Sequence, residues 1–286
     1  MRAAFVRPQE IGGGDGVVKA GELVDATYPD GASLSGAARK VLVLLLAKAA
    51  GDAWKDREFC ITKGELRGRH KGNERLDKVL DELQRTLLRV RVRSPRGQDA
   101  VQVAAVMQSR TEELSDDAQS LVYWRFSEPM RLIMQASDHY AELQRQAVLA
   151  FDSRYSVTLY EQGCLRYRRQ HPVWHGTLQE LREMLGVPSG RYRDWTDLRR
   201  FTLEAAKVEI DHLAPFILTW QEFRRGRAVE RVEIQFTPKD DNARAEAEAE
   251  IQRSRVGRKA RRTGAVETVA GIAPEVAAEL ARLRKG

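Results

Sequence analysis

Basic and hydroxyl side chains gather in one ten-residue segment of the chain, RYRDWTDLRR at positions 191–200. An arginine presents a fork of hydrogen-bond donors that fits a guanine edge or a phosphate, and hydroxyl side chains add contacts to phosphates or thymine methyl groups. The candidates in and just after this segment are Arg191, Tyr192, Arg193, Thr196, Arg199, Arg200 and Thr202. The segment therefore favours contact with nucleic acid.

A second basic cluster consists of Arg224, Arg225 and Arg227, which surround Gly226 between two runs of alternating apolar residues. Side chains at the tip of such a strand turn can reach phosphates or the minor groove. An ordinary solvated surface is the alternative, because residues 152–238 contain 14 Lys and Arg against 12 Asp and Glu. Only segregation of the charges onto one face would create a DNA site.

Two capping boxes mark the helices that must position these side chains. Thr62-Lys63-Gly64-Glu65 and Thr177-Leu178-Gln179-Glu180 both have the T-x-x-E pattern, in which each side chain satisfies a backbone donor of the other residue. In both boxes the final Glu is followed by Leu and Arg. This repetition indicates that the chain contains two copies of one module.

The first copy is predicted to contain a helix capped by Ser33 and ended by Gly51, a strand at 59–61, the helix of the first box, a longer helix capped by Asn73, and a hairpin at 90–107. The second copy has a helix capped by Ser153, the helix of the second box ended by Gly186, a helix at 194–213 and a hairpin at 216–236. On the long helix, Leu198, Phe201, Ala205 and Val208 are expected to share one apolar face. Between the copies we expect a strand at 121–126 and one connecting helix at 127–146.

This order of elements is that of a winged helix, a helix-turn-helix followed by a β-hairpin wing, and the predicted fold class is α+β with tandem winged-helix domains. The predicted divisions are a flexible Gly-rich N-terminal arm at 1–32, an N-terminal winged helix at 33–150, a C-terminal winged helix at 151–238 and a flexible, charged, Ala-rich tail at 239–286. In the N-terminal module the candidate DNA contacts are Arg67, Arg69, Lys71 and Arg75. The basic run at 253–262 either touches phosphate or is a solvated surface.

Composition limits the other possibilities. The 286 residues carry a formal net charge of +7, which biases the search toward an anionic partner. No apolar run approaches the roughly 18 residues of a membrane span, and the N-terminal sequence lacks a secretory signal, so a cytoplasmic protein is expected. The cysteines, Cys60 and Cys164, are expected to be small buried thiols.

The stretches SRYSVTLYE, LQELREMLGVPSGRYRDWTDLRRFTLEAAKVEI and GRAVERVEIQF resemble the iteron-binding initiator replication proteins of bacterial plasmids. The resemblance covers roughly 34–238 and is strongest over 153–236. It implies that a monomer binds direct repeats in double-stranded origin DNA. It also implies a dimer, in equilibrium with the monomer, that represses the initiator's own promoter, with the N-terminal module shifting between dimer interface and auxiliary DNA contact.

The family's main base-reading helix falls here on Arg193, Trp195, Thr196, Arg199 and Arg200, although Trp195 can equally be a core residue. Host replication initiator and helicase proteins are the further partners that the resemblance implies. The expected location is the bacterial cytoplasm, in association with the plasmid and the nucleoid.

An enzymatic function is not expected. The pair His171 and His175 has the wrong spacing for a nuclease metal site, and the chain contains no P-loop or recognisable nucleophile motif. We therefore expect no catalytic residue, metal or cofactor. A winged-helix transcriptional repressor without a replication role stays open as the alternative: direct repeats beside the gene favour an initiator, and a single inverted repeat favours a repressor.

Overall fold

The computed structural model describes residues 15–28, 33–68 and 74–262. The predicted cap Asn73, the candidates Arg69 and Lys71, and the outer parts of the predicted arm and tail lie outside these ranges. The chain divides into two compact units, Met1–Ile251 and Gln252–Gly286. None of the helices in the described ranges has both the length and the apolar character that a membrane span requires.

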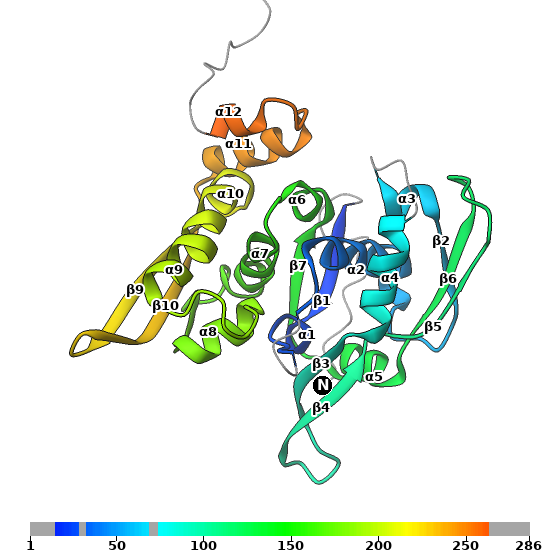
Figure 1. Cartoon of the computed structure of the whole chain (residues 1–286), viewed down its shortest axis with the longest axis horizontal. Helices are drawn as coiled ribbons and strands as arrows, with labels where there is room; N and C mark the ends of the chain where they lie inside the picture. Colours follow the sequence, from blue (N-terminus) through cyan, green and yellow to red (C-terminus); the bar gives the residue numbers. More distant parts are fainter. Residues whose placement is uncertain (1–14, 29–32, 69–73, 263–286) are drawn as a thin grey trace, which may run out of the picture. The chain divides into compact units, whose positions relative to one another are not determined.

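The N-terminal half contains both helices and strands (Figure 1). In chain order they are β1 (Gly16–Ala20), α1 (Gly21–Val24), α2 (Gly36–Ala49), a 3-10 turn (Ala50–Asp52), β2 (Phe59–Thr62), α3 (Lys63–Arg67), α4 (Glu74–Arg85), β3 (Leu87–Arg93), β4 (Asp99–Ala105), β5 (Met107–Glu112), β6 (Leu121–Phe126), α5 (Glu128–Ala136), β7 (Tyr140–Gln144) and α6 (Arg145–Ala150). The strands form two antiparallel pairs, β1 with β7 and β3 with β4, and a sheet in the order β2-β6-β5.

The C-terminal half repeats the pattern of helix, strand, two helices and hairpin. Its elements are α7 (Arg154–Arg166), β8 (Val173–Thr177), α8 (Leu178–Leu185), α9 (Trp195–Leu198), a π-helical segment (Arg199–Glu204), α10 (Ala205–Leu213), β9 (Phe216–Arg225), β10 (Ala228–Pro238), α11 (Asp241–Gln252) and α12 (Arg258–Arg262). Here β8, β10 and β9 form one antiparallel sheet. The tandem winged-helix prediction is confirmed. The modules differ in that β2 pairs with β6 and not with its wing.

Both capping boxes form as predicted. The Thr177 hydroxyl accepts a hydrogen bond from the Glu180 amide at 3.2 Å, and the Glu180 carboxylate accepts one from the Thr177 amide at 2.8 Å. These bonds from the backbone and hydroxyl of Thr177 hold the pKa of Glu180 below its ordinary value. The first box, between Thr62 and Glu65, has the same reciprocal bonds.

The cap of α2 is Ser35 and not the predicted Ser33. The Ser35 hydroxyl accepts from the Ala38 amide at 3.1 Å, and it also donates to the carboxylate of Glu82 on α4 at 2.8 Å. The Ser33 hydroxyl donates instead to the carbonyl of Gly186, where α8 ends, at 2.8 Å. Each serine is thus held by a residue that is distant in the sequence, Ser35 by Glu82 and Ser33 by Gly186.

The predicted connecting helix at 127–146 is wrong. The segment forms α5, then β7, then the start of α6. Strand β7 forms because β1 supplies its partner, and the pairing buries Ala141 and Leu143. The predicted flexible arm differs for the same reason, since residues 16–20 are strand β1. In the predicted flexible tail, residues 241–252 form helix α11, which buries Ala247 and Ile251.

The expected apolar face of the long helix is also wrong. Leu198 is fully buried, but the side chains of Phe201 and Val208 are 44% and 47% exposed. The buried set is Leu198, Thr202, Leu203, Ala206, Glu209, Ile210 and Leu213. The π-helical turn at 199–204 inserts extra backbone per turn, which rotates the helix faces relative to a regular α-helical repeat.

Helix α7 packs against elements of both modules, including α2, β7 and α10 (Figure 1). It buries Glu161, whose carboxylate lies 2.8 Å from the Lys19 ammonium of β1 and 3.9 Å from the Arg39 guanidinium of α2. All three side chains are more than 90% buried. A carboxylate this deeply buried persists because it is paired with these cations, so the three charges fix β1 and α2 against α7.

The two cysteines differ in exposure. Cys164 lies in α7, and burial raises the pKa of its thiol far above the ordinary value. Cys60 is exposed on β2, against the prediction of two buried thiols, because the strand alternation places its neighbours Phe59 and Ile61 in the core.

Candidate nucleic-acid interface

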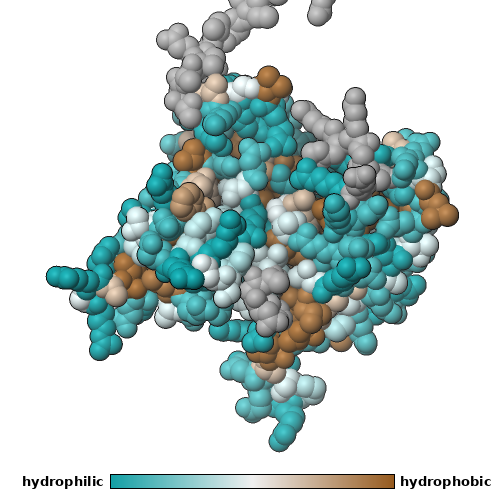
Figure 2. Space-filling view, viewed as in Figure 1, coloured by the Kyte–Doolittle hydropathy of each residue, from teal (hydrophilic) through white to brown (hydrophobic). Residues whose placement is uncertain are grey.

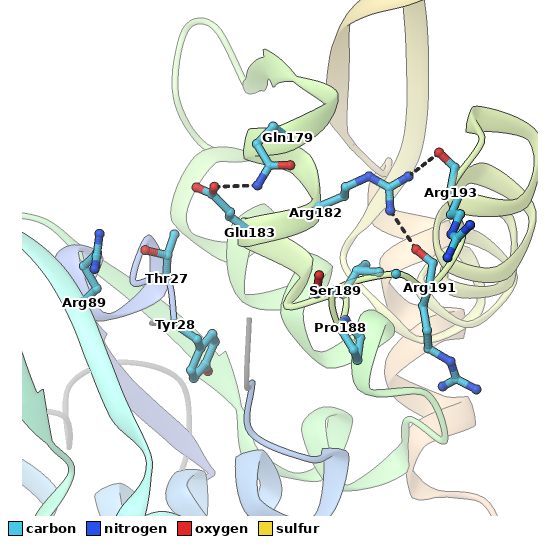
Figure 3. A pocket seen from close by; sticks show the side chains of 12 residues that line it. Thr27, Tyr28, Arg89, Gln179, Arg182, Glu183, Pro188, Ser189, Arg191 and Arg193 are labelled. Carbon is cyan, nitrogen blue, oxygen red and sulfur yellow. Dashed lines mark hydrogen bonds between the residues drawn. The ribbon is translucent and has the colours of Figure 1, made fainter. Parts of the chain in front are cut away.

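The turn that leads into α9 is held from inside by one arginine of α8. The Arg182 guanidinium donates to three successive carbonyl groups, at 2.9 Å to Arg191, at 3.0 Å to Arg193, and to Tyr192 between them (Figure 3). The backbone needs this support because Gly190 and Tyr192 have positive φ angles of 80° and 48°. Arg182 thereby fixes the direction in which the turn presents its own arginines.

Two aromatic rings extend this turn onto the long helix. Tyr192 and Phe201 stack with ring centroids 5.2 Å apart and planes inclined by 19°. The Arg191 guanidinium lies over the Tyr192 ring, 5.7 Å from its centroid, and the Arg200 guanidinium lies over the Phe201 ring, 5.4 Å from its centroid. Charged and apolar surface therefore alternate on the exposed side of the helix start.

The start of α9 is capped by Asp194, whose carboxylate accepts from the Asp197 amide at 2.8 Å. Around this cap the side chains of Arg191, Arg193, Thr196 and Arg200 are all exposed. These four predicted contacts are brought together on one surface. Exposed arginine donors at the first turns of a second helix are the arrangement by which helix-turn-helix proteins contact DNA.

Arg199 has a different environment from its neighbour Arg200. Its guanidinium forms ion pairs with Glu204 at 2.9 Å and with Glu222 of β9 at 3.3 Å. Burial raises the pKa of Glu222, but hydrogen bonds, those from Arg224 and Arg199 among them, outweigh it and hold the pKa below its ordinary value. Arg199 is thus tied to the wing strand, and Trp195 is a half-buried side chain packed against the core.

The predicted contact by Thr202 is wrong. Its side chain is fully buried, and its hydroxyl donates to the Leu198 carbonyl at 2.6 Å. Phe201 and Val208 take the exposed positions that the regular repeat assigned to the core. No local signal in the sequence marks the π-helical turn, so the sequence does not indicate that Thr202 is buried while Phe201 and Val208 are exposed.

The wing β9–β10 carries the other predicted cluster at its tip, where Gly226 has a positive φ of 62°. Arg224 is paired with Glu222 at 2.7 Å, whereas Arg225 lies 3.9 Å from Glu230 and is 85% exposed. Arg227 is exposed as well. Hydrophilic side chains project at the end of the wing, with paler and apolar surface beside them (Figure 2). Arg225 and Arg227 are therefore the wing arginines that are most available to an external anion.

In the N-terminal module, Arg67 is half-buried and donates to the carbonyls of Lys63 at 3.3 Å and Asp116 at 3.2 Å. It occupies the position in the first Glu-Leu-Arg repeat that Arg182 occupies in the second. Both arginines bind backbone carbonyls inside their own module, so the repeat itself is the signal that could have identified Arg182. Arg75 is exposed near the start of α4.

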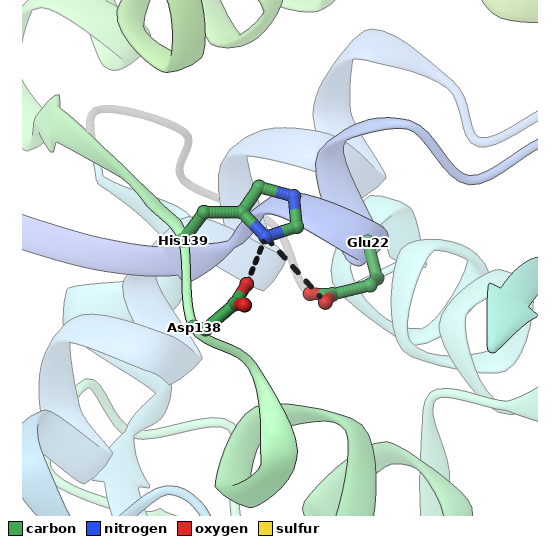
Figure 4. Close-up of side chains that lie close together, drawn as sticks. All are labelled: Glu22, Asp138 and His139. Carbon is green, nitrogen blue, oxygen red and sulfur yellow. Dashed lines mark hydrogen bonds and ion pairs between the residues drawn. The ribbon is translucent and has the colours of Figure 1, made fainter. Parts of the chain in front are cut away.

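One group of possible metal ligands is present in the described ranges, formed by Glu22, Asp138 and His139 (Figure 4). His139 Nδ1 lies 2.9 Å from Asp138 Oδ1 and 3.6 Å from Glu22 Oε1. The hydrogen bond between Asp138 and His139 holds the pKa of Asp138 below its ordinary value. The group is a polar contact between α1 and the segment before β7.

Two family models match the chain in the order of its two modules. "Initiator Replication protein, WH1" matches residues 16–164, and "Initiator Rep protein, WH2" matches residues 177–236. A search of curated proteins gave no match. Among solved structures, the chain is similar to the "Crystal structure of Pi initiator protein in complex with iteron DNA", with 16% identity and a TM-score of 0.56 over 79% of this chain and 98% of that one. The two family models together span most of the chain, which therefore belongs to the family of initiator replication proteins.

Proposed function

We propose that this initiator binds double-stranded DNA at repeated sites, iterons, in the origin of a plasmid, with α9 and the following helix in the major groove. The observation that carries the proposal is the exposed group Arg191, Arg193, Thr196 and Arg200, in which Arg182 holds the backbone of Arg191 and Arg193. The similar solved structure, that of Pi initiator protein, is described as a complex with iteron DNA. The excess of basic residues, a net charge of +7, supports an anionic partner.

The proposed division of labour gives the main DNA contact to residues 151–238, with the wing arginines Arg225 and Arg227 on phosphates or in the minor groove. Residues 33–150 supply dimerisation and an auxiliary DNA contact, in which Arg69, Lys71 and Arg75 remain candidates. The hairpin β3–β4 supports a dimer surface, because it exposes Leu87, Val101 and Val103 at 45%, 56% and 48%. The dimer would repress the initiator's own promoter.

The initiator acts in the bacterial cytoplasm without catalysis of its own, and it recruits host replication initiator and helicase proteins that open the origin. A winged-helix repressor without a replication role is the second candidate. The arrangement of the binding sites separates the two, since an initiator requires several direct repeats and a repressor dimer requires one inverted repeat.

Arg200→Ala is expected to weaken binding to the specific duplex about tenfold, while Arg199→Ala weakens it much less. The reason is that Arg200 is exposed, whereas the Arg199 guanidinium is paired with Glu204 and Glu222. Fluorescence anisotropy on one origin repeat and on a scrambled duplex measures both variants. A loss for Arg200→Ala that is confined to the repeat assigns Arg200 to a base, and an equal loss on both duplexes assigns it to a phosphate. If the wild-type protein binds neither duplex, the proposed function is wrong.

A further inference from the structure

Glu222 is an acidic side chain on the basic surface of the C-terminal module. It lies on β9, and its side chain is 18% exposed. The Arg199 guanidinium of the long helix donates to Glu222 Oε1 at 3.3 Å, and the Arg224 guanidinium near the wing tip donates to Glu222 Oε2 at 2.7 Å. One carboxylate therefore engages an arginine from each of the two elements that are proposed to contact DNA.

A second carboxylate extends this group along the long helix. Glu204 Oε1 lies 2.9 Å from Nε of Arg199. Glu204, Arg199, Glu222 and Arg224 thus form a chain of side chains in which negative and positive charges alternate. The four charges cancel, so this part of the surface is electrically neutral between the exposed arginines of the helix start and those of the wing tip.

The two arginines are kept from other anions by pairing and not by burial. Burial raises the pKa of Glu222, but hydrogen bonds from Arg224 and Arg199 help to hold it below its ordinary value, so the carboxylate is ionised at neutral pH. The side chains of Arg224 and Arg199 are 52% and 35% exposed, and both therefore reach the surface. Without the Glu222 charge, Arg224 would be available to a phosphate, while Arg199 would keep its pair with Glu204.

This arrangement bears on how the protein discriminates between DNA sequences. Contacts to phosphates strengthen binding to any duplex, because they carry no sequence information. A carboxylate that occupies arginines and repels phosphates limits this general binding, and repulsive elements of this kind are a common source of specificity. Glu222 also joins the long helix to the wing, and an origin repeat requires a fixed arrangement of the two, whereas arbitrary DNA does not.

We propose that Glu222 is a specificity-determining residue, which withholds Arg199 and Arg224 from the phosphates of arbitrary DNA and keeps the long helix and the wing in the arrangement that an origin repeat requires. This inference rests on the proposed function. It assigns to the DNA-binding surface an acidic residue that selects against the wrong sequence, in addition to the arginines that provide attraction.

The test is Glu222→Gln in the full-length chain, which removes the charge and keeps the shape of the side chain. Fluorescence anisotropy over a range of salt concentrations measures binding to an origin repeat and to a scrambled duplex. On the scrambled duplex we expect affinity to rise roughly threefold to tenfold and the slope of log K against log salt to steepen by about 0.9, the value for one new phosphate contact. On the origin repeat the loss of the link between helix and wing should offset that gain, so the preference for the repeat falls.

Two further variants identify the arginines that are released. Adding Arg224→Ala to Glu222→Gln should reverse the change in slope, because Arg224 makes the new contact. Adding Glu204→Gln to Glu222→Gln should release Arg199 as well and steepen the slope by about 1.8 relative to wild type.

Glu233→Gln is the matched control for the change in net charge. Glu222 lies opposite Val232 in the β9–β10 register, and strand alternation places Glu233 on the other face of the same hairpin. This variant should bind both duplexes nearly as the wild type does. An equal gain for Glu233→Gln would attribute the effect to net charge and overturn the assignment.

Three other results would also overturn it. An equal gain on both duplexes would mean that Glu222 limits phosphate contacts without affecting specificity. A loss on both, in a variant that circular dichroism shows to be folded, would make Glu222 a support for binding in general. Unchanged affinities would mean that it has neither role. If the wild-type protein binds neither duplex, the proposed function itself fails, which is distinct from each of these results.

Discussion

Replacing Arg182 by alanine is expected to lower the affinity for an origin repeat about a hundredfold, which corresponds to roughly 2.7 kcal/mol. Three carbonyl groups, those of residues 191, 192 and 193, lose their common donor in this variant. Each hydrogen bond from a charged donor contributes about 1.5–3 kcal/mol, and the positive φ of Tyr192 loses its support. Arg191 and Arg193 are then no longer held toward the DNA. Fluorescence anisotropy at constant salt measures the loss.

Two controls separate positioning from charge. Arg182→Lys keeps the charge but cannot reach three carbonyls with one ammonium group, so it should lose most of the affinity as well. Gln179→Ala removes an exposed side chain of the same helix that donates a hydrogen bond to Glu183, and this variant should bind nearly as the wild type does. If Arg182→Lys binds the repeat as tightly as wild type, Arg182 acts through its charge and not by holding the turn.

Gly163→Ala is expected to lower the free energy of unfolding by about 3 kcal/mol, at the upper end of the cost of overpacking a core. Gly163 lies inside α7, where alanine ordinarily stabilises a helix by about 1 kcal/mol relative to glycine. Here an added Cβ would lie 2.1 Å from Cζ of Phe216 and 2.8 Å from Cδ1 of Phe236. Both rings are fully buried in the second module, so they have no room to move aside. Urea unfolding followed by circular dichroism measures the change.

Gly36→Ala is the matched control for Gly163→Ala. A Cβ at Gly36, at the start of α2, would meet Arg154 at 3.4 Å or more, which is an ordinary contact. That variant should be neutral or more stable by about 0.5 kcal/mol, because alanine restricts the unfolded chain. Equal stability of the two variants would mean that the approach of α7 to the wing strands is looser than described.

The parts of the fold that could be predicted from the sequence are those whose causes lie within a few residues. Both capping boxes, the stop at Gly186 and the wing turn at Gly226 depend on neighbouring side chains and backbone only. Strand β7 could not be predicted in this way, because its partner β1 lies at the other end of the module. The cap of α2 is Ser35 and not Ser33 for a similar reason, since Glu82 on α4 holds Ser35 and the Gly186 carbonyl at the end of α8 holds Ser33.

The candidate site was predictable in composition but not in geometry. Sequence reasoning placed Arg193, Thr196 and Arg200 at the start of the long helix, and the structure leaves all three exposed there. The sequence did not show that Arg199 is paired while Arg200 is exposed, because the Glu222 carboxylate that pairs with Arg199 lies on the wing strand β9.

Footprinting of the purified protein on the DNA that flanks its own gene tests the central claim most directly. The account predicts protection of several evenly phased direct repeats at moderate salt, with protection lost in Arg182→Ala and weakened in Arg200→Ala. The loss should follow the variants' measured affinities, with Gln179→Ala giving the wild-type pattern. Protection of one inverted repeat alone would contradict the origin-binding role and favour a repressor, and absence of protection at low salt would contradict DNA binding by this interface.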